Sequence, residues 1–275
     1  MSNNLWERIN YLIDKPYILS SNIYEYDISK ANINILRSMD MITEQEYNNF
    51  LIMDKMSREV IIGERIREER ETTKTSTSRG YSVTYDTIKN GIIEAKRQLF
   101  LHNKLSDDSI IRIANDAVYV QSIGPLQYTD FIIGKNNHPV SFICKGNYRS
   151  MIILNKILVL YNIDQTGNFI VDVKGINDEK IHFHEKMLEF ICEMIFLMES
   201  GDKNTTLYRF NSFYESYIKR DLELDYYREF NEYSCFRIKN SRVGTLFLDP
   251  KYKNYLDISY NISILRQLYS YILSI

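Results

Sequence analysis

Cysteine is scarce in this sequence and follows no metal-binding or disulfide pattern. Cys144, Cys192 and Cys235 are the only cysteines among 275 residues, and they lie far apart. An odd number at such spacing provides neither a disulfide framework nor the paired ligands of a zinc site. The apolar pattern around Cys192 indicates a small core residue. The sequence therefore predicts a reduced protein without structural disulfides.

The sequence also lacks a secretory leader and a membrane-spanning run. Its first residues, Met1 to Arg8, show no basic segment followed by an apolar one. No apolar run approaches the roughly 20 residues needed to cross a bilayer. We therefore expect a soluble, cytoplasmic protein with no membrane partner.

No excess of positive charge is present either. The 34 lysines and arginines stand against 36 aspartates and glutamates, which gives a formal net charge of −2. Proteins that lie along nucleic acids usually carry a basic excess, because phosphate contacts supply most of their non-specific affinity. The balance disfavours such a role without excluding it, since charge can be segregated onto one face.

What is present is typical of a globular α+β protein. The chain is 44% hydrophobic and 25% charged, and its length suits one large domain or two small ones. The order of helical and strand-like patterns predicts a small mixed sheet with helices, followed by a mainly helical C-terminal part. Gly124 and Pro125 mark the expected boundary between a first domain, 1–124, and a second, 125–275.

Local patterns place the expected elements of the first domain. Leu5, Trp6 and Ile9 share one side of a short helix before Pro16. Thr43 and Glu46 form a capping box that opens a helix. Residues 72–80 are rich in threonine and serine and predict a mobile loop, with a solvated connector or a phosphate-closing loop as its two roles. The remaining expected elements are a strand over 23–28, helices over 31–39, 57–71 and 87–102 (capped by Asp86), and a hairpin of strands 110–114 and 117–120.

The expected second domain begins with short strands and ends in helices. A strong apolar stripe from Met187 to Met198 predicts a buried helix. The other expected elements are strands over 131–133, 140–144, 151–161 and 169–173, and helices over 205–219, 222–230 and 262–275.

Two aspartates at the ends of predicted strands form the sharpest candidate site. Asp27 closes the strand 23–28, and Asp116 lies in the turn of the later hairpin. A strand, a helical excursion and a hairpin can bring two such residues side by side. Paired carboxylates suit two Mg²⁺ ions, which prefer oxygen ligands and bridge a phosphoryl group during transfer. Taken singly, each aspartate is equally typical of a helix cap or a turn.

The segments around both aspartates resemble the palm of family A DNA polymerases. Residues 27–37 are similar to the first palm motif, and residues 111–119 to the second carboxylate motif. The helix 91–97 is placed like the helix beneath the palm, and residues 58–63 like part of the fingers helix. The resemblance covers roughly residues 20–122. The sequence departs from the family's second motif at Asn115 and Ala117, which replace the usual histidine and glutamate.

The resemblance implies a nucleotidyltransferase site, if catalysis is retained. Asp27 and Asp116 would be the catalytic residues and would hold two Mg²⁺ ions, and a nucleoside triphosphate would meet nearby cations. Phosphoryl transfer of this kind depends mainly on positioning and electrostatics. The implied substrate-binding residues are Ser29, Arg58, Arg65, Lys96 and Asn115.

The chain also resembles uncharacterised phage-encoded proteins that share both segments and a Tyr226–Asn231 element. That likeness implies a location in the host cytoplasm. Two functions stay open: a polymerase-like protein acting on nucleic acid, and a non-catalytic binding or assembly protein built on a degenerate palm, with a protein partner. The near-neutral charge, the short fingers region and Ala117 favour the second.

Three weaker candidates lie in the second half of the sequence. His182 and His184 alternate as strand neighbours do, but no third ligand has a fitting spacing. Asp172 and Lys174 fit either a phosphate-binding face or an exposed ion pair. The Tyr226–Asn231 element fits base stacking or aromatic packing between helices.

Overall fold

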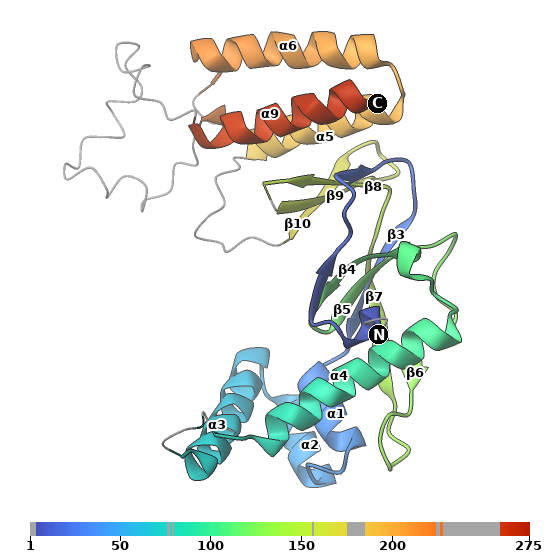
Figure 1. Ribbon diagram of the computed structural model, residues 1–275, viewed down its shortest axis with the longest axis vertical. Helices are drawn as coiled ribbons and strands as arrows, with labels where there is room; N and C mark the ends of the chain where they lie inside the picture. The colour runs from blue at the N-terminus through green and yellow to red at the C-terminus, as the bar shows by residue number, and fades with distance from the viewer. Residues whose placement is uncertain are drawn as a thin grey trace, which may run out of the picture. The chain divides into compact units, whose positions relative to one another are not determined.

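The computed structural model describes residues 4–75, 78, 80–155, 157–174, 185–223, 226–227 and 259–275. The chain divides into two compact units (Figure 1). Unit 1 comprises residues 1–14 and 22–147, and unit 2 comprises residues 15–21 and 148–275. Each unit combines one sheet with helices, so the predicted α+β class is confirmed. Within the described residues, no helix has the length and apolar character that crossing a membrane requires.

The unit boundary differs from the one expected at residues 124 and 125. Strands β6 (Asp130–Phe131) and β7 (Val140–Tyr148) belong to the sheet of unit 1, where β7 lies beside β3 (Ile23–Ile28). The backbone pairing of these strands keeps the chain in unit 1 as far as Asn147. Gly124 and Pro125 only connect two strands of the same sheet.

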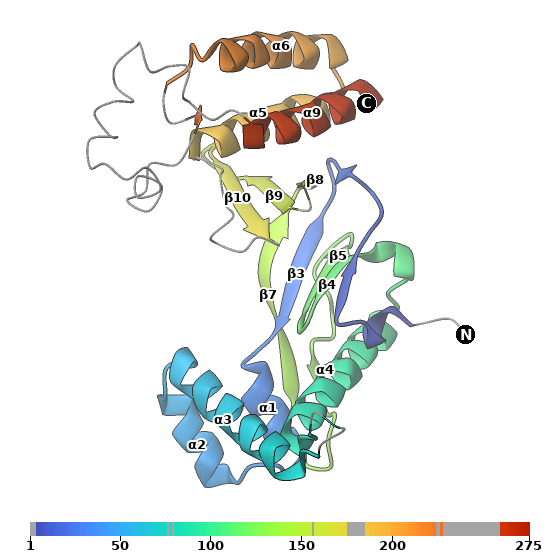
Figure 2. The same ribbon diagram turned by 60° about the vertical axis from the view of Figure 1, so that its left-hand side comes forward.

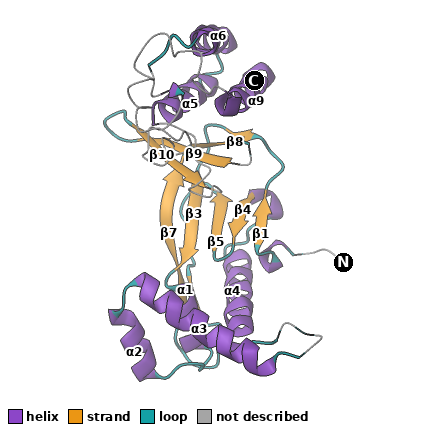
Figure 3. Cartoon of the chain, turned by 90° about the vertical axis from the view of Figure 1, so that its left-hand side faces the viewer, coloured by secondary structure: helices purple, strands orange, loops and turns teal. Residues whose placement is uncertain are grey.

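The sheet of unit 1 has six strands in the order β1-β4-β5-β3-β7-β6. Figure 3 shows β7, β3, β5, β4 and β1 side by side. Strands β4 (Ile110–Ala114) and β5 (Ala117–Gln121) form the predicted hairpin, and β5 pairs with β3. The sheet was expected to be mixed, but pairing is antiparallel from β1 through β3 and again between β6 and β7.

The helix predicted before Pro16 is wrong. Leu5–Glu7 form a single 3₁₀ turn (η1), and Asn10–Leu12 form strand β1. Strand β1 pairs with residues 112–114 of β4 and adds an edge to the sheet. A strand of three residues is too short to display the alternation that distinguishes a strand from a helix.

Four helices cover unit 1: α1 (Ala31–Ser38), α2 (Glu44–Ile52), α3 (Lys55–Thr73) and α4 (Val83–His102). The capping box of Thr43 and Glu46 is confirmed at the start of α2. Asp54 caps α3, because its side chain accepts a hydrogen bond from the backbone of Ser57. The predicted cap of α4, Asp86, is wrong: the Ser82 side chain accepts from the Tyr85 backbone, so the helix starts four residues before Thr87.

The core of unit 1 lies between the sheet and the helices α1 and α4 (Figure 2). Ile35 of α1 and Ala95 and Leu99 of α4 are fully buried there. Gly91 lets α4 approach α1 closely, since a Cβ atom at this position would lie 2.2 Å from the Ile35 side chain.

The sheet of unit 2 has the order β10-β9-β8-β2, with antiparallel pairs throughout. The single strand predicted over 151–161 is two strands, because Asn155 takes a left-handed conformation (φ 49°) and turns the chain back. The short strand contributed from the start of the chain is β2 (Tyr17–Ile18). The other strands are β8 (Ser150–Leu154), β9 (Ile157–Ile163) and β10 (Phe169–Lys174).

In the described part of unit 2, the helices are α5 (Glu185–Glu199), α6 (Lys203–Lys219) and α9 (Ser259–Ser274). The predicted apolar stripe of α5 is confirmed: Met187, Phe190 and Met198 are buried in the core of this unit, as is Cys192. The helix predicted over 222–230 lies largely outside the described residues, and so does most of the loop core at 76–79.

Candidate functional site

Asp27 and Asp116 lie next to each other at the ends of neighbouring strands in the unit 1 sheet, where the chain leaves β3 towards α1. Asp27 is the penultimate residue of β3 and pairs with Ala117, the first residue of β5. Asp116 occupies the β4–β5 turn, and its carbonyl accepts a hydrogen bond from the Ile28 backbone at 3.3 Å. Asn115 holds the turn in a left-handed conformation (φ 54°). The hairpin geometry thus sets both carboxyls at one point on the sheet.

The two carboxyl groups are close enough to affect each other's ionisation. Burial raises the pKa of Asp27, and the nearby charge of Asp116 raises it further. Burial also raises the pKa of Asp116, although its own backbone, the charge of Lys55 and a hydrogen bond with Asp27 act in the opposite direction. Two half-buried carboxyls that affect each other's ionisation favour binding of a proton or a cation.

A cleft of about 660 Å³ opens in front of this pair and is called the carboxylate cleft. Lys55, at the start of α3, and Lys145, on β7, line it from different elements. Both lysines are exposed, and their charges lower the pKa of Asp27 against the effect of burial. The cleft therefore places ammonium groups around two carboxylates, a combination that suits a cation together with a phosphate group.

Three of the predicted substrate-binding residues also line the carboxylate cleft: Ser29, Arg58 and Asn115. Ser29 follows β3, and its backbone N–H donates to the Ser141 carbonyl at 2.8 Å. Arg58 donates to the Met53 carbonyl at 2.7 Å, so its guanidinium also closes the connection between α2 and α3. The structure brings these residues together with both aspartates.

Arg65 and Lys96 are placed elsewhere. Arg65 points away from the cleft along α3, where it contacts Glu69 at 3.5 Å and the Met41 carbonyl at 3.4 Å. Lys96 is only 1% exposed and donates to the Arg8 carbonyl at 2.5 Å. Burial lowers the pKa of Lys96 to about 8, although the charge of Asp116 counteracts it. The ammonium of Lys96 therefore supports the floor beside Asp116 and is not open to a ligand in the carboxylate cleft.

Lys96 and the Asp116 turn are linked through the first residues of the chain. The Asn115 backbone N–H donates to the Ile9 carbonyl at 2.7 Å, one residue from the carbonyl that Lys96 binds. Residues 8 and 9 thus join α4 to the β4–β5 turn.

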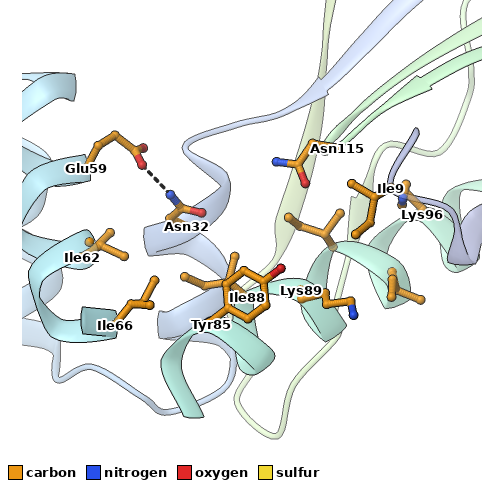
Figure 4. A pocket seen from close by; sticks show the side chains of 13 residues that line it. Ile9, Asn32, Glu59, Ile62, Ile66, Tyr85, Ile88, Lys89, Lys96 and Asn115 are labelled. Atoms are coloured by element: carbon orange, nitrogen blue, oxygen red, sulfur yellow. Dashed lines mark hydrogen bonds between the residues drawn. The ribbon is translucent and has the colours of Figure 1, made fainter. Parts of the chain in front are cut away.

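Sequence reasoning did not identify Lys145 and Glu59 as members of the site. Both line the carboxylate cleft, and Glu59 accepts a hydrogen bond from Asn32 of α1 at 2.8 Å (Figure 4). Lys145 lies in the middle of β7, in an exposed stretch that begins at Ile143. Only the pairing of β7 beside β3 places it near Asp27, and no local pattern signals that neighbour.

Within the described residues, no group of three or more histidine, cysteine or acidic side chains converges as a metal site would require. The candidate histidines 182 and 184 lie outside those residues, as does Tyr226–Asn231 beyond residue 227. Asp172 and Lys174 form an ion pair at 2.7 Å, one of the two predicted alternatives, and Tyr148 donates to the same carboxylate at 2.9 Å. This pair needs no ligand to account for it.

The fold and site together define an α+β protein with paired carboxylates in a cation-lined cleft. The model of the Bacteriophage PBS1 gene 130 protein family matches residues 1–274, so the chain belongs to that family. The expected phage origin is thereby confirmed. A search of functionally curated proteins found no match.

Proposed function

We propose that unit 1 binds divalent cations at Asp27 and Asp116 and uses them in nucleotidyl transfer. The observation that carries the proposal is the placement of two half-buried carboxyls at adjacent strand ends in one cleft, where the pKa values of both are raised. Such a pair is unfavourable when both groups are ionised, and a bound cation would remove that cost. Carboxylate oxygens are the ligands that Mg²⁺ prefers, and its remaining positions are commonly filled by water and phosphate oxygens.

The surrounding residues would have distinct roles in this proposal. Bound Mg²⁺ would supply the charge that stabilises a phosphoryl group in transfer. Lys55 and Lys145 would neutralise phosphate oxygens, and Ser29 and Asn115 would orient the substrate beside the aspartates. The likeness of residues 27–37 and 111–119 to polymerase palm motifs supports a nucleotide as the substrate.

Calorimetric titration with Mn²⁺, with and without a nucleoside triphosphate, tests the cation site. We expect the wild-type protein to bind Mn²⁺ more tightly with the triphosphate, and Asp116→Asn to weaken that binding at least about tenfold. Asp108→Asn is the matched control, because Asp108 is exposed and lies outside the carboxylate cleft. Equal binding by the wild type and Asp116→Asn would contradict the proposal.

Thermal unfolding without divalent cations separates this role from a structural one. Because its pKa is raised, ionised Asp116 destabilises the fold at neutral pH. Asp116→Asn should then melt at the same temperature as the wild type or higher. A turn residue without a ligand role would give a lower melting temperature on substitution.

A second candidate is binding without turnover. It is favoured because, among the described residues, Glu59 lines the cleft but does not join Asp27 and Asp116 in a group of three that could hold a metal ion. Primer extension distinguishes the two candidates: incorporation that is lost in a folded Asp27→Asn variant supports transfer. Triphosphate-dependent Mn²⁺ binding without any incorporation supports the binding role.

A further inference from the structure

One face of α3 lines three neighbouring hollows of unit 1. The first is the carboxylate cleft, the second is a hollow of about 260 Å³ between α3 and α4, and the third is a hollow of about 330 Å³ along the end of α3. The second and third are called the middle and distal hollows. Adjacent hollows share residues: Glu59 lines the first and second, and Gly63 and Ile66 line the second and third.

The α3 residues that line these hollows are spaced three or four apart, so they form one stripe along the helix. Lys55 and Glu59 begin the stripe, Ile62 and Ile66 continue it, and Arg70 leads to its end. The stripe ends at Lys74. The nineteen helical residues of α3 extend over about 28 Å at 1.5 Å per residue. The three hollows together are called the cationic groove.

Helix α4 supplies the facing side of the middle hollow. Its residues Tyr85, Ile88, Lys89 and Ile92 again follow helical spacing. Figure 4 shows isoleucines of both helices directed into the space between them, with the Tyr85 ring among them. The floor of the groove is therefore apolar and aromatic.

Positive charge is concentrated along this groove. Leaving aside the buried Lys96, lysine and arginine contribute four side chains to the carboxylate cleft, one to the middle hollow and three to the distal hollow, against four carboxylates in all. Glu64 and Glu68 of α3 line none of the hollows. Glu69 turns to the hydroxyl groups of Ser82 and Thr84. A chain of net charge −2 thus carries a local cationic surface.

Tyr85 gives the groove a stacking position. The Arg70 guanidinium lies over the Tyr85 ring at 4.8 Å from its centroid, and the tyrosine is 41% exposed. Aromatic rings and arginine planes of this kind bind unpaired bases by stacking, without regard to sequence.

We propose that the cationic groove binds single-stranded nucleic acid. Its length of about 28 Å spans several successive nucleotides, so a strand fits it and one nucleotide does not fill it. The exposed cations meet the phosphates, and the Tyr85 ring meets the bases above a floor of largely buried isoleucines. A duplex would present only its backbone and would offer no unpaired base to Tyr85.

The inference rests on the proposed function for the chemistry at the Asp27 end of the groove. Strand binding itself needs no divalent cation, because the contacts come from lysine, arginine and tyrosine. It is therefore measured in EDTA, where failure of the cation site has no effect on the result.

Fluorescence anisotropy with a labelled 12-nucleotide oligothymidine tests the groove. We expect the wild type to bind the oligonucleotide with an affinity that falls steeply with salt. Arg67→Gln/Lys74→Gln removes two exposed cations of the distal hollow and should weaken binding about tenfold, with a shallower salt dependence. The matched control, Lys104→Gln/Lys135→Gln, removes two exposed cations outside the groove and should bind as the wild type does.

Tyr85 provides a second, uncharged test. Tyr85→Ala should weaken binding about tenfold through lost stacking, while Tyr85→Phe keeps the ring and the affinity. Circular dichroism shows whether each variant is folded, and the surface substitutions at residues 67 and 74 keep the test valid if Tyr85→Ala is not. The proposal is overturned if the wild type does not bind, if the two double variants weaken binding equally, or if duplex of the same length binds as tightly as the single strand.

Discussion

At the scale of single residues, Glu69 determines how α3 is attached to α4. Its carboxylate accepts hydrogen bonds from the Ser82 hydroxyl at 2.6 Å and from the Thr84 hydroxyl and backbone at 2.6 and 2.9 Å. Burial opposes ionisation of this carboxyl, but the hydrogen bonds outweigh it and lower the pKa of Glu69 to about 2. One side chain thus fixes the end of the groove near Arg70.

The lowered pKa of Glu69 predicts how the free energy of unfolding of unit 1 changes with pH. Because the folded pKa lies below the ordinary value of 4.5, the stabilisation is complete above pH 4.5 and is lost as pH falls towards about 2. Glu69→Gln should lower the free energy of unfolding by about 1–3 kcal/mol at pH 7 and should flatten its decline in acid. Urea unfolding at several pH values measures both effects.

Glu68→Gln is the control for this prediction. Glu68 is the exposed neighbour on the same helix, and its loss should change the free energy of unfolding by less than about 0.5 kcal/mol. Equal losses in the two variants would show that the contacts with Ser82 and Thr84 do not hold α4.

At the scale of elements, two helical glycines predict opposite effects of the same substitution. A Cβ atom at Gly91 of α4 would lie 2.2 Å from Ile35, whereas one at Gly63 of α3 meets nothing within 4 Å. Gly91→Ala should therefore destabilise unit 1 by about 1–3 kcal/mol through overpacking. Gly63→Ala should stabilise it by about 0.5–1 kcal/mol, because alanine loses less backbone entropy in a helix.

Thermal unfolding of both variants compares the two sites directly. A melting temperature for Gly91→Ala at or above that of Gly63→Ala would mean that α1 and α4 are not packed as closely as the Ile35 contact requires.

Elements with strong local signals could be predicted from the sequence. Strand 23–28, the capping box at Thr43 and the hairpin around Asn115 are each determined by residues close in the chain, and each is found at its expected place. Strand β1 could not be predicted, because only its pairing with β4 makes it a strand. The sequence predicts too late a start for α4, because Val83 and Tyr85 are weak helix formers and hide the cap at Ser82.

In the candidate site, too, features set by nearby residues could be predicted, and features set by remote pairing could not. Asp27 and Asp116 could be placed together from the order of strand, helices and hairpin. Lys145 could not, since its neighbour Asp27 is set by the pairing of remote strands. Lys96 was expected to meet a ligand, but burial directs its ammonium to the Arg8 carbonyl, and burial is not visible in a charged residue's local sequence.

At the scale of the whole molecule, the first 22 residues serve both units. Residues 10–12 form an edge of the unit 1 sheet, and residues 17 and 18 form an edge of the unit 2 sheet. Within unit 2, Tyr17 packs on Tyr271 with ring centroids 5.7 Å apart and shares a hydrogen bond of 2.9 Å with Ser274. Unit 2 therefore depends on a segment that precedes nearly all of unit 1 in the sequence.

Aromatic truncations within this segment should act on different units. Tyr17→Ala should lower the stability of unit 2 by about 2 kcal/mol through loss of ring packing and of the edge contact. Trp6→Ala, eleven residues earlier, removes the ring that packs edge-on against Phe100 at 5.9 Å and should act on unit 1. Amide hydrogen exchange locates each effect, with faster exchange expected in β8 and β9 for Tyr17→Ala and in β1 and α4 for Trp6→Ala.

The pattern of exchange, rather than its size, decides between two descriptions of the chain. If each variant accelerates exchange in one unit, the two cores open as separate cooperative units, although the N-terminal segment supplies a strand to each. If Tyr17→Ala accelerates exchange equally in β4 and β5, the short strands β1 and β2 couple the cores into one unfolding transition. In that case a ligand bound in the cationic groove of unit 1 would also stabilise unit 2, because any binding to the folded state would raise the stability of both.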